Sequence, residues 1–198
     1  MSALAKNYNR RKIAFKKGKG SFLYSTNGKK YLDFVQGIAV NSLGHSNPYL
    51  IRAINRQAKK VWHVSNAFII PEGEKLAKRL TQKTFADKII FQNSGAEATE
   101  ASIKVARRYF YSIGQTNKNR ILCIKNSFHG RTIAAINASG SKKMQEGFGP
   151  KVNGFDHFKF GNLKSLKRSI KKNTAAIMIE TIMGESGIKV HSNAFLKN

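Results

Sequence analysis

The sequence predicts an α/β fold with a mixed, mostly parallel sheet, because short apolar runs alternate with helical patterns. Residues 89–91 form an apolar run whose length suits a buried strand, and a breaker at residues 93–95 interrupts it. A helix is predicted directly afterwards, with an apolar face formed by Ala98, Ala101, Val105 and Tyr109. Residues 120–125 and 174–180 are predicted as further buried strands, the second one preceded by a helix over residues 163–171.

The elements before this unit are predicted from turn and helix-start signals. Residues 20–34 contain two short β-prone runs on either side of Asn27-Gly28, a dipeptide typical of tight hairpin turns. Residues 37–44 are apolar and loop-like. Pro48 predicts the first turn of a helix, and a second helix is expected over residues 72–83. The first of these helices has an apolar face formed by Leu50, Ile51, Ile54, Ala58 and Val61.

The composition is strongly basic but sufficient for a folded core. The chain has 198 residues, 41% of them hydrophobic, and 36 Lys and Arg against 10 Asp and Glu, giving a net charge of +26. The basic residues are scattered and do not alternate with aromatic residues, which favours a solvated basic surface that attracts anionic metabolites. A basic nucleic-acid-binding module is the alternative, and it predicts strongly salt-dependent binding.

The cysteine and hydropathy patterns bear on the cellular compartment. Cys123 is the single cysteine and lies in an apolar run, so we expect a buried core thiol and no disulfide within the chain. No apolar run approaches the length of a membrane span, and no signal-peptide core is present. The chain is therefore predicted to be soluble and cytoplasmic, with no membrane partner.

The turn at residues 94–96 is a candidate anion site. Ser94 and Glu97 have the spacing of a capping box, in which the serine hydroxyl accepts from the Glu97 amide. A strand followed by a turn of small residues and a helix directs several free amides and the positive end of the helix dipole at one point. Gly95 and Ala96 would let a phosphate approach the backbone. The alternative is a well-capped helix without a ligand.

Four motifs in one order carry a family resemblance. They are Asn93-Ser94-Gly95-Ala96-Glu97-Ala98, Phe128-His129-Gly130-Arg131-Thr132, Glu146-Gly147-Phe148-Gly149-Pro150 and Glu180-Thr181-Ile182-Met183-Gly184-Glu185-Ser186-Gly187. Together they closely resemble the class III, ornithine-type aminotransferases, which use pyridoxal phosphate. The resemblance runs from about Tyr8 to the last residue, which leaves little room for a removable leader. Within the family the chain is most similar to the branch that acts on N-acetylornithine.

The resemblance implies a fold-type I architecture and a homodimer. Residues 1–65 would form the N-terminal segment of the small domain. Residues 66–198 would form the first part of the large domain that binds pyridoxal 5'-phosphate, and this domain would be incomplete. Family members place the active site at the interface between two subunits.

The resemblance also assigns cofactor residues. Ser94, Gly95 and Ala96 would bind the cofactor phosphate, and Phe128 would stack on the pyridine ring. Arg131 would bind the substrate carboxylate, because a guanidinium fork suits a planar carboxylate, and His129 would border the pocket. Without the resemblance, Phe128 is interpreted as a core aromatic residue and Arg131 as a surface charge.

Three further substrate residues follow from the same resemblance. Glu185 would pair with an arginine outside this chain and release it for the second substrate, while Glu180 would lie near the ring or the substrate. Tyr8 matches an N-terminal tyrosine that reaches the substrate. Thr181 departs from the family, which usually has proline there, and this loosens a rigid corner of the loop. No metal site is expected. In the default interpretation both acids are solvated or paired in salt bridges.

The implied reaction moves an amino group from N-acetylornithine to 2-oxoglutarate in arginine biosynthesis. The lysine that forms a Schiff base with the cofactor, and the aspartate that binds its ring nitrogen, are expected beyond Asn198, so the chain alone is predicted to be inactive. An ornithine or 4-aminobutyrate aminotransferase is the alternative within the family, although the amino-acid sequence of residues 145–150 favours the N-acetylornithine branch.

Overall fold

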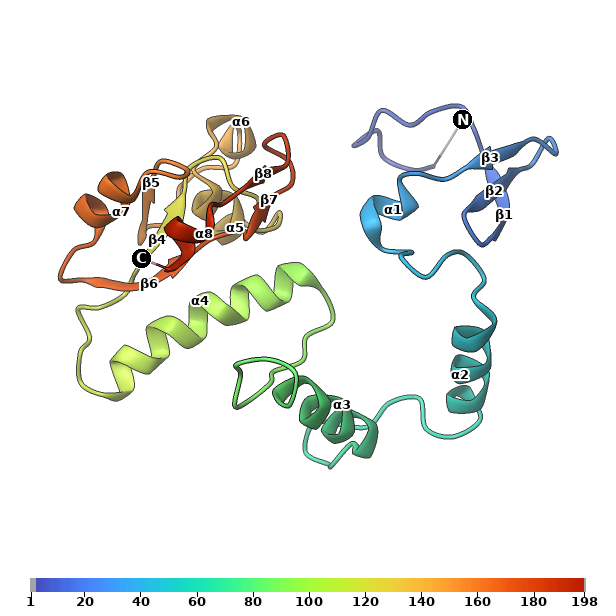
Figure 1. Cartoon of the computed structure of the whole chain (residues 1–198), viewed down its shortest axis with the longest axis horizontal. Helices are drawn as coiled ribbons and strands as arrows, with labels where there is room; N and C mark the ends of the chain where they lie inside the picture. The colour runs from blue at the N-terminus through green and yellow to red at the C-terminus, as the bar shows by residue number, and fades with distance from the viewer. Residues whose placement is uncertain (1–2, 198) are drawn as a thin grey trace. The chain divides into compact units, whose positions relative to one another are not determined.

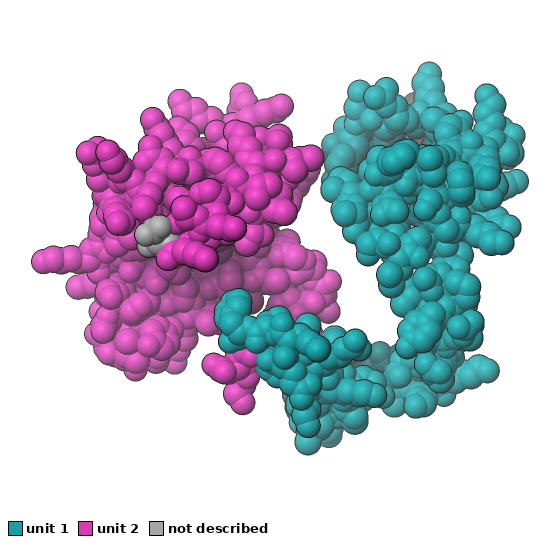
Figure 2. Space-filling view, viewed as in Figure 1, with its two compact units in different colours: residues 1–85 teal, residues 86–198 magenta. Residues whose placement is uncertain are grey.

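The computed structural model describes residues 3–197. The chain divides into two compact units, unit 1 with residues 1–85 and unit 2 with residues 86–198 (Figure 2). The expected assignment of residues 1–65 to a small domain concerns the family's domain organisation, and it stays a prediction.

Unit 1 begins with a three-stranded antiparallel sheet in the order β1-β2-β3 (Figure 1). Strands β2 (Phe22–Ser25) and β3 (Lys30–Leu32) confirm the predicted hairpin. Gly28 in its turn has a φ of 84°, a value that favours glycine because it lacks a Cβ. Strand β1 (Phe15–Lys19) was not predicted, because its Lys-rich sequence carries no apolar alternation and it pairs only with β2 at the edge of the sheet.

The two helices predicted for unit 1 form close to their expected positions. The short helix α1 (Gln36–Ala39) is kinked by non-helical residues, in agreement with a loop-like segment. Helix α2 (Pro48–Ala58) is capped by Asn47, whose side chain accepts from the amides of the first turn, and α3 (Pro71–Thr81) follows. The expected apolar face of α2 is not buried, and Ile54 remains 66% exposed. Among the described residues of unit 1, no hydrophobic side chain is fully buried. Such exposed apolar surface is typical of an interaction site.

Unit 2 contains a parallel sheet, which confirms the predicted fold class. Strands β4 (Arg120–Ile124), β5 (Phe155–Phe158) and β6 (Thr174–Met178) are all parallel and lie in the order β5-β4-β6. Strand β5 was not predicted, because its sequence Phe-Asp-His-Phe places polar residues in the middle of a strand. A short antiparallel pair, β7 (Ile182–Met183) and β8 (Lys189–Val190), completes the strands.

Helices cover both faces of this sheet (Figure 1). They are α4 (Gly95–Ser112), α5 (Ile133–Ser139), α7 (Leu163–Ser169) and α8 (Asn193–Lys197), while the short helix α6 (Lys142–Gln145) contacts α5. Because side chains alternate along a strand, Ile121 and Cys123 of β4 pack with residues of α4 and α5 on one face. Leu122 and Ile124 pack on the other face with Phe158, Met183 and residues of α7 and α8. Strand β4 therefore lies at the centre of the core.

Two of the sequence predictions for unit 2 are wrong. Residues 89–91 do not form a strand, because no described strand pairs with them, and Ile90 is 64% exposed. The predicted face of α4 is also wrong, since Val105 and Tyr109 are 51% and 58% exposed while Ile103 is buried. The inner face includes the polar residue Glu100, which accepts from the Thr132 hydroxyl, so this face does not have a purely apolar pattern in the sequence.

The prediction of a core thiol is confirmed. Cys123 is fully buried in the sheet, and burial, followed by the charge of Asp156, raises the pKa of its thiol to about 12. Within residues 3–197 no helix is both long enough and apolar enough to cross a membrane, and no cluster of side chains suits a metal ion.

The central position of β4 leads to a test of stability. Leu122 is fully buried, so Leu122→Ala should lower the free energy of unfolding by about 2–5 kcal/mol through lost burial and a residual cavity. Ile177 lies opposite Leu122 in the β4–β6 register but is 47% exposed, and Ile177→Ala should cost about 1 kcal/mol. Urea unfolding of both variants measures the difference. Equal losses would contradict this core.

Candidate active site

The turn before α4 forms the predicted capping box. The Ser94 hydroxyl accepts from the Glu97 amide at 3.2 Å and donates to the Glu97 carboxylate at 3.0 Å. Asn93 also donates to this carboxylate, and the hydrogen bonds from Asn93 and then Ser94 hold the pKa of Glu97 below its ordinary value. The helix start is therefore fixed by local hydrogen bonds.

The same turn leaves two amides available to a ligand. The N–H groups of Gly95 and Ala96 form no hydrogen bond with the described residues. A Cβ added at Gly95 would meet nothing within 4 Å, so the space beside the turn is open. The 18-residue helix α4 adds the positive end of its dipole. The residues present thus fit a phosphate group at this point.

The loop that follows β4 packs directly against this turn. Gly130 has a φ of 117°, and a Cβ added there would lie 3.6 Å from the Cα of Ala96 and 3.4 Å from the Cβ of Ala135. A hydrogen bond from the Thr132 hydroxyl to the Glu100 carboxylate joins the same loop to α4. The phosphate-type turn and the loop with Phe128 and Arg131 therefore lie on the same side of the sheet.

Phe128 and His129 are held by hydrogen bonds at the carboxyl end of β4. The Phe128 amide donates to the Glu180 carboxylate at 2.8 Å, and the His129 Nε2 atom lies 2.8 Å from the Ser127 hydroxyl. Because that hydroxyl donates to the Ile124 carbonyl, Nε2 of His129 is assigned as the protonated nitrogen. Burial lowers the pKa of His129, and His157 adds to this shift, whereas the charge of Glu180 opposes it. A neutral His129 follows at pH 7.

Arg131 and Glu185 line one cavity of about 760 Å³. The Ser186 hydroxyl donates to the Asn126 carbonyl at 2.6 Å, and this bond ties the Glu185 turn to the loop after β4. The residues of the lining that the sequence analysis did not assign to a site are Asn126, Ser127, Thr132, Ile133, Ile136, Ser141, Lys143, Met144, Phe148 and Ser186. Three of them, Thr132, Phe148 and Ser186, lay in the quoted motifs without an assigned role, and that was the available signal.

The other predicted site residues are not part of this lining. The turn at residues 94–96 packs against Gly130, the residue before Arg131 of the cavity lining. His129 is hydrogen-bonded to Ser127, which also lines the cavity. Phe128 lies between these two residues in sequence, and Glu180 accepts from its amide. Tyr8 lies in unit 1 and is 58% exposed, so its role stays a prediction.

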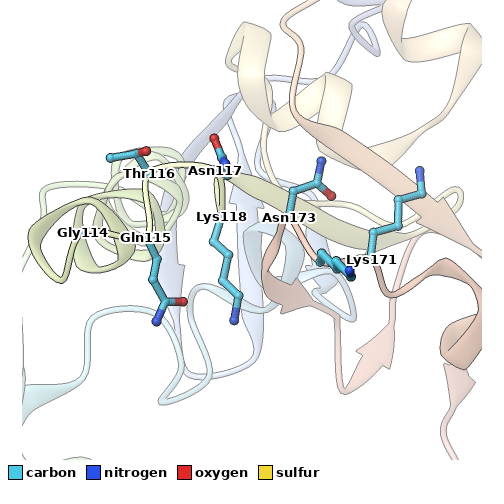
Figure 3. Close-up of a pocket in the computed structure, with 8 residues that line it drawn as sticks. Gly114, Gln115, Thr116, Asn117, Lys118, Lys171 and Asn173 are labelled. Atoms are coloured by element: carbon cyan, nitrogen blue, oxygen red, sulfur yellow. The ribbon is translucent and has the colours of Figure 1, made fainter.

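A second hollow of about 710 Å³ lies at the opposite edge of the sheet, where β4 and β6 begin (Figure 3). Two of its three lysines are already engaged, since Lys171 Nζ lies 3.4 Å from Asp156 Oδ1 and Lys118 Nζ lies 4.9 Å from the centre of the Phe110 ring. None of the predicted site residues lines it. Open α/β sheets bind ligands at the carboxyl ends of their strands, so we place the site at the first cavity.

The family is shown by comparison with known proteins. The family model described as aminotransferase class-III matches residues 3–198. The chain therefore belongs to the class III aminotransferases, a family that uses pyridoxal phosphate.

Individual relatives agree with this family. The chain is 54% identical over 190 residues to the acetylornithine aminotransferase of Agrobacterium fabrum, covering 96% of this chain and 48% of that protein. It is 46% identical over 197 residues to the acetylornithine aminotransferase of Rhodobacter capsulatus, covering 100% of this chain and 50% of the relative. The chain thus spans about half the length of these curated relatives.

Solved structures confirm the fold. The ornithine aminotransferase of Toxoplasma gondii superposes with a TM-score of 0.92 at 30% identity, covering 98% of this chain and 47% of that one. Another structure of that enzyme has pyridoxal phosphate at partial occupancy in its active site. An omega-transaminase from Thermomicrobium roseum gives a TM-score of 0.89 at 27% identity, covering 98% of this chain and 50% of that one.

His129 leads to a prediction about pH. Because its folded pKa is lowered, its contribution to stability is fully present above the ordinary value of 6.5 and is lost as the pH falls from there through the folded pKa. An NMR titration of the ring should therefore give a midpoint below that of the same ring in the urea-unfolded chain. A native midpoint at or above the unfolded one would contradict the burial of His129.

Proposed function

We propose that this chain forms part of a pyridoxal-phosphate-dependent aminotransferase that moves an amino group from N-acetylornithine to 2-oxoglutarate. The observation that carries the proposal is the packing of Gly130 on Ala96, which brings an open phosphate-type turn beside the loop with Phe128 and Arg131. The similarity to acetylornithine aminotransferases supports the choice of amine donor. In the whole protein we expect a homodimer in the cytoplasm.

The cofactor would be held by the residues of unit 2. The amides of Gly95 and Ala96, with the Ser94 turn, would bind its phosphate, and Phe128 would supply an aromatic ring for its pyridine ring. When bound, the cofactor supplies an electron sink for the carbon that loses a proton. These residues would orient the cofactor, because the phosphate turn and the Phe128 backbone are both fixed by hydrogen bonds.

Arg131 and Glu185 would select the substrates. Both are exposed residues of the same cavity lining, so a ligand in the cavity can reach them. Arg131 binds the carboxylate common to the amino acid and the oxo acid in a bidentate manner. Glu185 gives the cavity a negative group that favours a donor with an amine and disfavours a second carboxylate unless an arginine pairs with it. His129 and Tyr8 complete the expected substrate contacts.

Ornithine is the second candidate donor, because the structure of an ornithine aminotransferase superposes so closely on this chain. Side-by-side turnover of N-acetylornithine, ornithine and 4-aminobutyrate by the full-length protein separates the candidates. We expect N-acetylornithine to have the highest kcat/KM. A preference for either other amine would overturn the assigned donor, and no turnover of any of them would overturn the proposed function. The 198-residue chain alone is expected to give no turnover.

The carboxylate site can be tested by one substitution. Arg131→Lys in the full-length protein should lower kcat/KM about 10- to 100-fold, because lysine binds a carboxylate as a point charge without the bidentate fork. Cofactor absorbance should be retained. Arg168→Lys on the exposed face of α7 is the matched control and should behave as wild type. An Arg131→Lys enzyme with unchanged kcat/KM would remove Arg131 from the site.

A further inference from the structure

Glu180 lies directly after β6 and binds two separate loops through backbone amides. Its Oε2 atom accepts from the Phe128 amide at 2.8 Å, and its Oε1 atom accepts from the Gly184 amide at 3.4 Å. Phe128 belongs to the loop after β4, whereas Gly184 begins the turn between β7 and β8. One half-buried carboxylate therefore connects the ends of two neighbouring parallel strands.

We propose that Glu180 is a positioning residue that sets the separation of Phe128 and Glu185, a role that rests on the proposed function. A charged acceptor forms stronger hydrogen bonds than a neutral one, and here each oxygen serves one loop. With both oxygens directed at backbone amides, Glu180 acts through Phe128 and the Glu185 turn, and substrate contact is left to Arg131.

A second hydrogen bond joins the loop after β4 to the turn that carries Glu185. The Ser186 hydroxyl donates to the Asn126 carbonyl at 2.6 Å, so the same two loops are joined on both sides of Glu185. Met183, the residue before this turn, is 1% exposed and packs in the core with Leu122. Glu185 thus lies on a short segment that is fixed at both ends.

These hydrogen bonds also bear on Thr181, where the family usually has proline. Proline would restrict the backbone of the turn through its fixed φ. Thr181 lacks this restriction, but the turn is closed across it by the bond between Glu180 and Gly184. We infer that the carboxylate supplies the rigidity that Thr181 does not.

Hydrogen exchange in this chain tests the geometry without any cofactor. In the wild type, the Phe128 and Gly184 amides should exchange at least about tenfold more slowly than the amide of exposed Gly149, since each has a charged acceptor. Glu180→Gln preserves the shape, but its NH₂ group cannot accept. At least one of the two amides should then exchange about tenfold faster.

Two controls make the exchange result specific. Glu146→Gln removes an exposed carboxylate of the same unit and should leave both rates unchanged. Amides of β4 and α5 should keep their rates in Glu180→Gln. Fast exchange of the Phe128 and Gly184 amides in the wild type would overturn the positioning role, and so would faster exchange throughout unit 2 in the variant. The wild-type rates test the two hydrogen bonds even if the variant fails to fold.

The full-length holoenzyme gives the functional readout. Glu180→Gln should retain bound cofactor but lose visible circular dichroism per bound cofactor, because a displaced Phe128 no longer fixes the ring. Unchanged dichroism would overturn the inference. If the wild-type protein binds no cofactor, the proposed function fails, whereas the exchange rates still decide whether Glu180 joins the two loops.

Discussion

The close packing of Gly130 on Ala96 is the constraint on which the site depends. A Cβ at Gly130 would make ordinary van der Waals contacts, at 3.6 Å with the Ala96 Cα and 3.4 Å with the Ala135 Cβ, so it is the φ of 117° that disfavours any residue with a Cβ. With glycine, the loop after β4 can lie against the first turn of α4. A phosphate-type turn, an aromatic ring and a guanidinium are then carried by adjacent segments at one end of a parallel sheet. None of these groups alone would indicate a cofactor.

Structure that depends on residues close in the sequence was predictable, whereas contacts between segments far apart in the sequence were not. The Ser94 capping box, the Asn27-Gly28 hairpin and the Pro48 helix start depend on residues a few positions apart, and all three form. Residues 89–91 and the inner face of α4 depend on which distant segment packs against them, and there the sequence predictions were wrong. Glu180 illustrates the same limit, because its two amide donors lie on different loops.

The net charge indicates contacts with anionic ligands, and the exposed apolar residues of unit 1 indicate contacts with further protein surface. A net charge of +26 is compatible with a basic surface around a site for anionic ligands, and the structure adds an arginine in the cavity. In unit 1, Trp62 and Phe34 are 87% and 89% exposed, which is unusual for side chains of this size. Since the chain spans about half the length of its relatives, further protein surface is available in those proteins to cover such residues.

The convergence of the phosphate turn and the aromatic loop can be measured directly in this chain. A Cβ built on Gly130 would lie 3.7 Å from the Ala96 Cβ, so the Ala96 methyl group and a Gly130 α-proton are near neighbours. A NOESY spectrum with isotope-labelled alanine methyl groups should therefore contain a strong cross-peak between them in the native chain and none in urea. If the native chain gives no such cross-peak while those of the β4 core are present, the two segments do not meet and no cofactor site is formed here.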